Sequence, residues 1–182
     1  QGRLIAFDKD LQAIAEAQRI DDPRFEIVHS GFVALADQLA ARQVARVDGV
    51  LMDLGVSSPQ LDDGSRGFSF RFDAPLDMRM DRSQGRSAYD IVNGYSEADL
   101  YRIIKDYGEE RWAKRIAEFI VKERQEKPLE RTEELVHVIK KAIPAGARKD
   151  GPHPAKRTFQ AIRIEVNDEL GILKDSLEHA AQ

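Results

Sequence analysis

Short apolar runs alternate with segments of helical periodicity over the first 53 residues. The runs at 3–8, 25–28 and 47–53 are each typical of a buried strand, and the first and third end in an aspartate. Between the runs, apolar residues recur at helical spacing, at 11–15 and 35–39. Strands that alternate with helices of about 10–15 residues are typical of βαβ units, so we predict a mostly parallel sheet.

The pattern changes at residue 54. Residues 54–85 are rich in Gly, Ser, Asp, Pro and Arg, and carry Phe68, Phe70 and Phe72 at every second position. A connection of this length is usually either functional or disordered. We therefore treat it as a candidate functional segment.

From Ser96 onward the chain is predicted to be helical. Ser96 and Thr132 are good N-cap residues for two of the helices, and Pro128 ends the helix between them. Apolar residues over 159–177 recur every three or four positions, which predicts one long amphipathic helix in spite of Gly171. This helix has an apolar face that needs a sheet to cover it. We therefore expect a sheet that is incomplete at both ends, as in part of a longer protein.

Composition excludes several classes of protein. With 42% hydrophobic and 33% charged residues in 182 positions, the chain has enough apolar surface for a folded core. No run approaches the roughly 20 apolar residues of a membrane span. The absence of cysteine excludes disulfides and thiolate metal sites, and the four histidines lack ligand spacing, so we predict no metal site.

Charge is unevenly distributed. The formal net charge is −4, yet residues 140–163 contain seven Lys or Arg and one Asp. Such a basic segment on an acidic chain indicates either docking of a phosphate-bearing partner or a solvated basic loop.

Two carboxylates are placed for ligand binding. Asp8 and Asp53 each end a predicted strand, and ligands of doubly wound sheets lie outside the carboxyl ends of the strands. Either side chain could accept hydrogen bonds from ribose hydroxyls, or cap the next helix. This pattern does not separate NAD enzymes from methyltransferases. Downstream, Ser57, Ser58 and Gln60 offer neutral donors and acceptors beside the same edge.

Six longer motifs occur together and in order. They are Phe7-Asp-Lys-Asp10, Met52-Asp-Leu-Gly-Val-Ser-Ser-Pro-Gln-Leu-Asp62, Arg66-Gly-Phe-Ser-Phe70, Pro75-Leu-Asp-Met-Arg-Met-Asp81, Tyr107-Gly-Glu-Glu-Arg111 and Arg157-Thr-Phe-Gln-Ala-Ile-Arg163. Over essentially its whole length the chain resembles the bacterial 16S ribosomal RNA cytosine-N4 methyltransferase family, which uses S-adenosylmethionine. The family also has a Gly-Gly-His cofactor loop before this stretch and a Ser-Phe-His-Ser segment after it. Because these 182 residues lack that cofactor loop, whether they bind the cofactor and are active on their own stays open.

The resemblance implies a fold, a reaction and partners. It implies a Rossmann-like methyltransferase core (1–84 and 156–182) with an inserted helical substrate-binding domain (85–155). It also implies methylation of the exocyclic N4 of a cytidine in 16S ribosomal RNA of the small subunit, in the cytoplasm. Whether the protein is a monomer or a homodimer stays open.

The resemblance also implies roles for individual residues. Asp8, Phe32, Asp53 and Gln60 would bind the cofactor, and acceptors from Asp53, Ser57 or Ser58 would polarise the cytosine amine. The RNA-binding candidates are Phe68, Phe70, Arg157 and Arg163. The alternative for the two phenylalanines is that they pin the long loop onto the core.

Two other functions remain open from the sequence. One is another enzyme of Rossmann type with a nucleotide cofactor, such as a dehydrogenase. The other is a fragment that binds RNA without catalysis.

Overall fold

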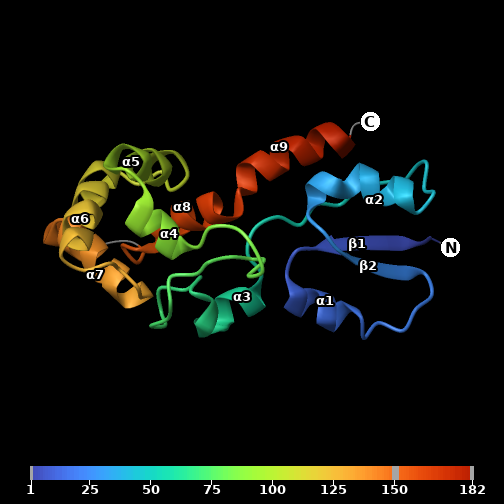
Figure 1. Ribbon diagram of the computed structural model, residues 1–182, viewed down its shortest axis with the longest axis horizontal. Helices are drawn as coiled ribbons and strands as arrows, with labels where there is room; N and C mark the ends of the chain where they lie inside the picture. The colour runs from blue at the N-terminus through green and yellow to red at the C-terminus, as the bar shows by residue number, and fades with distance from the viewer. Residues whose placement is uncertain (1, 149–151, 181–182) are drawn as a thin grey trace. The chain divides into compact units, whose positions relative to one another are not determined.

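The computed structural model describes residues 2–148 and 152–180, so residues 149–151 of the basic segment lie outside it (Figure 1). The chain divides into two compact units. The α/β unit comprises Gln1–Gly55, Met80–Ser83 and Asp168–Gln182, and the helical unit comprises Val56–Arg79 and Gln84–Asn167.

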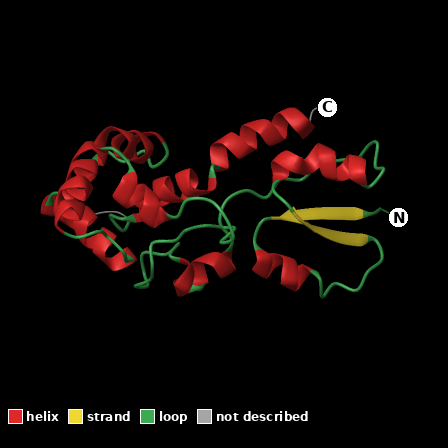
Figure 2. Cartoon of the chain, in the orientation of Figure 1, coloured by secondary structure: helices red, strands yellow, loops and turns green. Residues whose placement is uncertain are grey.

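Two parallel strands form the sheet of the α/β unit (yellow in Figure 2). They are β1 (Leu4–Asp8) and β2 (Phe25–His29), which confirms two of the predicted strands. Leu4 lies opposite Phe25, and Asp8 lies opposite His29. Because the strands run in the same direction, Asp8 and His29 end at the same edge of the sheet.

Short helices accompany these strands. Asp10 accepts the N–H of Gln12 and so caps the first of them, which packs against both strands. The last helix packs on the segment that follows β2. The helices of the unit are α1 (Leu11–Ala17), the 3₁₀ turn η1 (Phe32–Ala34), α2 (Leu35–Ala41) and α9 (Glu169–Ala180).

The predicted third strand is wrong. Within the part of the chain that the structure describes, residues 47–53 form no strand, and Leu51 is 96% exposed. A strand needs a neighbour for its N–H and C=O groups, and β1 and β2 pair only with each other there. The prediction that β1 is fully buried is also wrong, because Leu4 is 61% exposed and the rest of the strand is half-buried.

The helical unit is built from periodic apolar faces, as predicted. Leu100, Ile103, Ile116, Ile139 and Ile162 are completely buried where α5 packs on α6 and α8, and α6 packs on α7. The elements are α3 (Ser58–Asp62), η2 (Gly64–Arg66), α4 (Ala88–Gly94), α5 (Glu97–Asp106), α6 (Ala113–Glu126), α7 (Thr132–Ala142), η3 (Ala145–Arg148) and α8 (Lys156–Asn167).

One predicted cap is confirmed and one is wrong. The Oγ of Ser96 accepts the N–H of Asp99 at 3.1 Å at the start of α5. Thr132 is instead the first residue of α7, and its buried hydroxyl accepts the N–H of Ala74 and donates to the carbonyl of Phe72. Bonds to a distant loop have replaced the local bond that the sequence predicted.

The predicted single helix over 159–177 is two helices. Asp168 has φ 48° and separates α8 from α9. The amide of Asn167 donates to the carbonyl of Met78 at 2.8 Å, so tertiary contacts fix the end of α8. The apolar spacing continues past the break because a single residue interrupts it.

The compact helical unit is larger than the predicted insertion. It includes 56–79 and α8 besides most of 85–155. The boundaries predicted for an inserted domain stay a prediction.

Candidate functional site

Asp8 lies where β1 turns into α1. Its Oδ1 accepts the N–H of Asp10 at 2.8 Å, and its carbonyl accepts the N–H of Ser30 at 3.0 Å. No residue within 2–148 and 152–180 forms a hydrogen bond with the Oδ2 of Asp8. The side chain of Asp8 is half-buried. Asp8 therefore keeps one carboxylate oxygen able to accept a hydroxyl at the carboxyl end of the sheet. The donor set of a ribose fits this oxygen.

The segment after β2 lies close to the residue that follows Asp8. A Cβ built on Gly31 would come within 2.9 Å of the Cε of Lys9, so glycine lets this turn approach the lysine. The Nε2 of His29 also lies 3.1 Å from the carbonyl oxygen of Lys9. Phe32, which opens η1, is half-buried and next to this contact. The packing thus brings the Asp8 and Phe32 segments to one edge.

Lys9 sits in a mixed environment. Burial lowers the pKa of its ammonium group, while Asp168, Asp81 and Glu169 oppose that shift. The aliphatic part of the side chain covers Gly31, and its charge faces carboxylates at the start of α9. The sequence pattern predicted a ligand-binding role for Asp8 but none for Lys9.

Asp53 does not end a strand, which corrects the geometry predicted for it. It is exposed, in a segment without regular structure two residues before Gly55, whose φ is 103°. The reason is the missing third strand. A role in binding the cofactor or the acceptor stays a prediction for this residue.

Ser57 and Gln60 form a capping box at the start of α3 in the helical unit. The side-chain Oε1 of Gln60 accepts the N–H of Ser57 at 3.0 Å, and the Oγ of Ser57 accepts the N–H of Gln60 at 3.4 Å. Gln60 is buried, whereas Ser57 and Ser58 are exposed. The predicted cofactor residues are thus divided between the two units, and that they form one site stays a prediction.

Two of the three phenylalanines of the long loop, Phe68 and Phe70, pack against the protein, whereas Phe72 is 46% exposed. Phe68 is 5% exposed. Phe70 stacks on His153, with centroids 4.4 Å apart and planes at 5°, and meets Phe159 edge-on. Burial lowers the pKa of His153, which favours the neutral ring in this stack. The burial of Phe68 and the contacts of Phe70 agree with the alternative that these two residues pin the long loop onto the core; their RNA role stays a prediction.

Arg157 and Arg163 both lie on α8. Arg157 is exposed and donates to the carbonyl oxygen of Glu109, which joins α8 to the turn after α5. Arg163 is half-buried, and its carbonyl accepts the amide of Asn167 at 2.9 Å. Arg157 is thus exposed and Arg163 half-buried, and the RNA-binding role of both stays a prediction.

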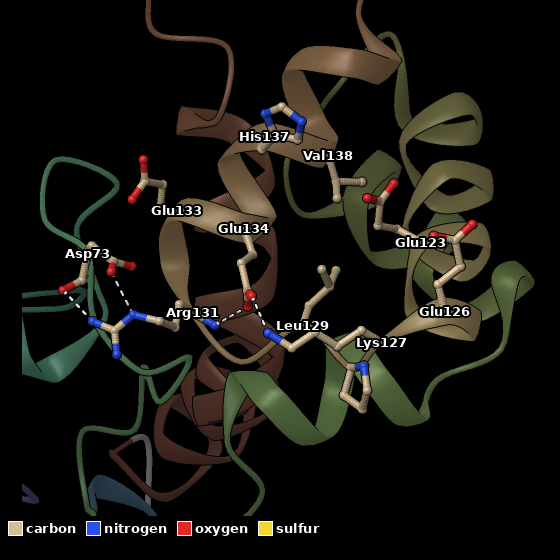
Figure 3. Close-up of a pocket in the computed structure, with 11 residues that line it drawn as sticks. Asp73, Glu123, Glu126, Lys127, Leu129, Arg131, Glu133, Glu134, His137 and Val138 are labelled. Carbon is tan, nitrogen blue, oxygen red and sulfur yellow. Dashed lines mark hydrogen bonds and ion pairs between the residues drawn. The ribbon is translucent and has the colours of Figure 1, made fainter.

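The sequence did not predict a hollow of about 350 Å³ between α6 and α7 (Figure 3). Carboxylates dominate its lining, and three of them are paired with cations of the chain itself. Arg131 binds Asp73 at 2.6 Å, Lys127 binds Glu134 at 2.9 Å, and Lys141 binds Glu123 at 3.2 Å. The charged residues that line it are Asp73, Glu123, Glu126, Lys127, Arg131, Glu133 and Glu134. The excess of carboxylates disfavours a polyanion at this face.

Neither a helix that could span a membrane nor a cluster of metal ligands occurs among the residues that the structure describes. None of their helices has the length and apolar character needed to cross a bilayer. They also include no group of three or more His, Asp or Glu side chains placed to hold a metal ion.

Several relatives found by comparison with known proteins share one description, Ribosomal RNA small subunit methyltransferase H, and three of them illustrate the similarity. The protein from Ruminiclostridium cellulolyticum is 54% identical over 183 residues, covering 98% of this chain. Those from Clostridioides difficile (strain 630) and Geobacter sp. (strain M21) are 58% and 57% identical, covering 100% and 98% of it. The chain spans 58–59% of the length of these relatives.

A family model also matches the chain, over residues 1–182. Its description is the MraW methylase family. Together with the relatives, this match confirms the resemblance to a ribosomal RNA methyltransferase family that the six motifs indicated. The chain belongs to the MraW methylase family.

Proposed function

We propose that the protein methylates the exocyclic N4 of a cytidine in 16S ribosomal RNA of the small subunit, with S-adenosylmethionine as methyl donor. The observation that carries this proposal is the family match over all 182 residues. The relatives, whose names specify the small-subunit RNA, support the substrate class. Since that RNA is in the bacterial cytoplasm, we infer the same location for the protein.

The α/β unit would hold the cofactor. The free Oδ2 of Asp8 would accept ribose hydroxyls, and the half-buried ring of Phe32 would pack on the adenine. Asp53 and Gln60 would complete the site near the methionine part. The bound cofactor supplies an electrophilic methyl group on a sulfonium.

Residues near the start of α3 would prepare the acceptor. The cytosine amine is a poor nucleophile because its lone pair is delocalised into the ring. Hydrogen-bond acceptors from Asp53, Ser57 or Ser58 would hold its N–H groups and favour the charge that grows on the nitrogen. Holding the reacting atoms about 3–3.5 Å apart supplies much of the remaining acceleration. The capping box would keep the backbone around Ser57 rigid during this step.

RNA contacts would come from Arg157 and Arg163 on α8, with Phe68 and Phe70 as the aromatic candidates. Arg157 offers an exposed guanidinium for a phosphate, and phosphate contacts position an RNA without reading its sequence.

A chimera tests this function. These 182 residues replace the 58% identical stretch of the Clostridioides difficile relative, and methyl transfer from labelled cofactor to small subunits lacking the modification is followed. We expect N4-methylcytidine as the product. Asp8→Asn should raise the KM for the cofactor at least about tenfold, because a hydrogen bond from a hydroxyl to a carboxylate contributes about 1.5–3 kcal/mol.

Asp37→Asn is the matched control, since Asp37 is an exposed carboxylate on α2 of the same unit. It should leave both kinetic constants unchanged. Asp53→Asn with Ser57→Ala should slow single-turnover methylation at saturating RNA. A folded chimera that yields no N4-methylcytidine, or an Asp8→Asn variant with a normal KM, would contradict the proposal.

A further inference from the structure

The Tyr107-Gly-Glu-Glu-Arg111 motif forms the turn between α5 and α6, and the proposed function gives it no role. The turn is fixed to α8 by backbone contacts. A Cβ on Gly108 would lie 2.6 Å from the carbonyl oxygen of Arg157, so only glycine allows this approach. The amide of Gln160 donates to the carbonyl of Tyr107 at 3.1 Å. Two motifs that are far apart in the sequence therefore form one rigid corner of the helical unit.

A hollow of about 410 Å³ opens beside this corner. Its volume lies within the range of about 300–1,000 Å³ that is typical of ligand pockets. Tyr101 and Lys105 line it from α5, and Arg111 and Lys114 line it from the turn and from α6. All four side chains are exposed. The hollow thus combines one accessible aromatic ring with three cations.

Cationic side chains lie over two aromatic rings at this corner. The Nζ of Lys105 lies 5.5 Å from the centroid of Tyr101, and the guanidinium of Arg111 lies 5.0 Å from that of Trp112. Glu109 and Glu110 also line the hollow, so three cations outnumber two carboxylates there, and the Oε1 of Glu110 accepts the N–H of Trp112 at 2.9 Å. An aromatic face beside cations is the arrangement that binds single-stranded RNA, by stacking of bases and pairing with phosphates.

We propose that this hollow binds a nucleotide of single-stranded RNA outside the methylation site, and this inference rests on the proposed function for its choice of RNA. Tyr101 stacks on a base, while Lys105, Arg111 and Lys114 pair with the flanking phosphates. This face supplies the accessible aromatic ring that Phe68 and Phe70 lack, because those two rings are packed against the protein. The hollow between α6 and α7 has the opposite charge character and would repel the same strand.

Fluorescence anisotropy of the full chain with a labelled single-stranded RNA of about 12 nucleotides tests the proposal. Tyr101→Leu should raise the Kd about 5- to 100-fold, and Tyr101→Phe, which keeps the ring, should restore binding to within about twofold of wild type. Lys105→Gln with Arg111→Gln should flatten the plot of log Kd against log salt by about 0.7 per lost phosphate contact.

Lys122→Gln with Lys127→Gln is the matched control, because it removes two exposed cations from the other half of α6 and its end. It should change the Kd by less than about twofold at moderate salt. The proposal is overturned if the control weakens binding as much as the test pair, if Tyr101→Leu binds as wild type, if the wild-type chain does not bind the RNA, or if polyglutamate displaces the RNA as well as unlabelled RNA does.

The methylation assay separates this inference from the proposed function. A chimera that fails to methylate, combined with RNA binding that depends on Tyr101, rejects the function and keeps the hollow as an RNA site. Normal methylation combined with RNA binding that ignores Tyr101 rejects the hollow alone.

Discussion

Gly67 is a position in the long loop that only glycine fits without strain. It follows η2 with φ 74°, and a Cβ there would collide with the backbone carbonyl of Pro75. Gly67→Ala should therefore lower the free energy of unfolding by about 2 kcal/mol or more, from the left-handed conformation and the collision together. Gly94→Ala, at the end of α4 with open space around it, should leave stability unchanged or raise it by up to about 1 kcal/mol. Chemical denaturation of both variants checks the contrast; equal losses would contradict it.

Tyr95 gives a residue-scale prediction on pH. Burial, together with its 2.6 Å hydrogen bond to Glu165, raises the pKa of Tyr95 from 10.0 to about 12. Since the folded state holds this proton more tightly, the contribution is complete below pH 10 and is lost as pH rises toward 12. The stability difference between wild type and Tyr95→Phe should be constant below pH 9 and shrink between pH 10 and 12. Urea denaturation as a function of pH measures it, and a difference that does not vary would refute the link.

At the scale of elements, one hydroxyl ties the long loop to α7. Thr132 is completely buried, accepts the N–H of Ala74 at 2.9 Å and donates to the carbonyl of Phe72 at 2.7 Å. Thr132→Val keeps the shape of the side chain but leaves two backbone groups without this partner. The free energy of unfolding should therefore fall by about 2–3 kcal/mol.

The chain offers a matched control on α8. Thr158 is equally buried, but its hydroxyl has no hydrogen-bond partner among the residues that the structure describes. Thr158→Val should therefore leave the free energy of unfolding within about 0.5 kcal/mol of the wild-type value, or raise it. Thermal and urea denaturation of the two variants side by side test this; similar losses would mean that shape, not hydrogen bonding, determines the cost.

At the scale of the whole molecule, the two units differ in how much apolar surface they bury. Ile14 and Val28 are the buried apolar side chains of the described part of the α/β unit, whereas those of the helical unit include Leu100, Ile116 and Ile139. Local opening costs less where fewer apolar contacts are broken. Amide hydrogen exchange should therefore be faster in β1 and β2 than in α6 under native conditions. Equal protection of the strands and of α6 would contradict this ranking.

Local pattern determined much of this protein. Apolar runs located β1 and β2, and the 3.6-residue period located the apolar faces of α5, α6 and α7, because these signals depend on neighbouring residues. Six contiguous motifs were enough to identify the family, since each is carried by adjacent letters of the sequence.

The predictions that proved wrong concern residues whose structure depends on partners distant in the chain. Residues 47–53 have the composition of a strand but no paired neighbour in the described part of the chain. Asp168, with φ 48°, breaks a regular apolar repeat just after Asn167 bonds to the carbonyl of Met78. Thr132 looks like a cap but bonds to a loop some 60 residues away. Likewise, alternation alone did not determine whether Phe70 faces solvent or stacks on His153. Sequence determined which elements can form, whereas tertiary structure decided which do form and which side chains stay exposed, because pairing and burial require groups that only folding brings together.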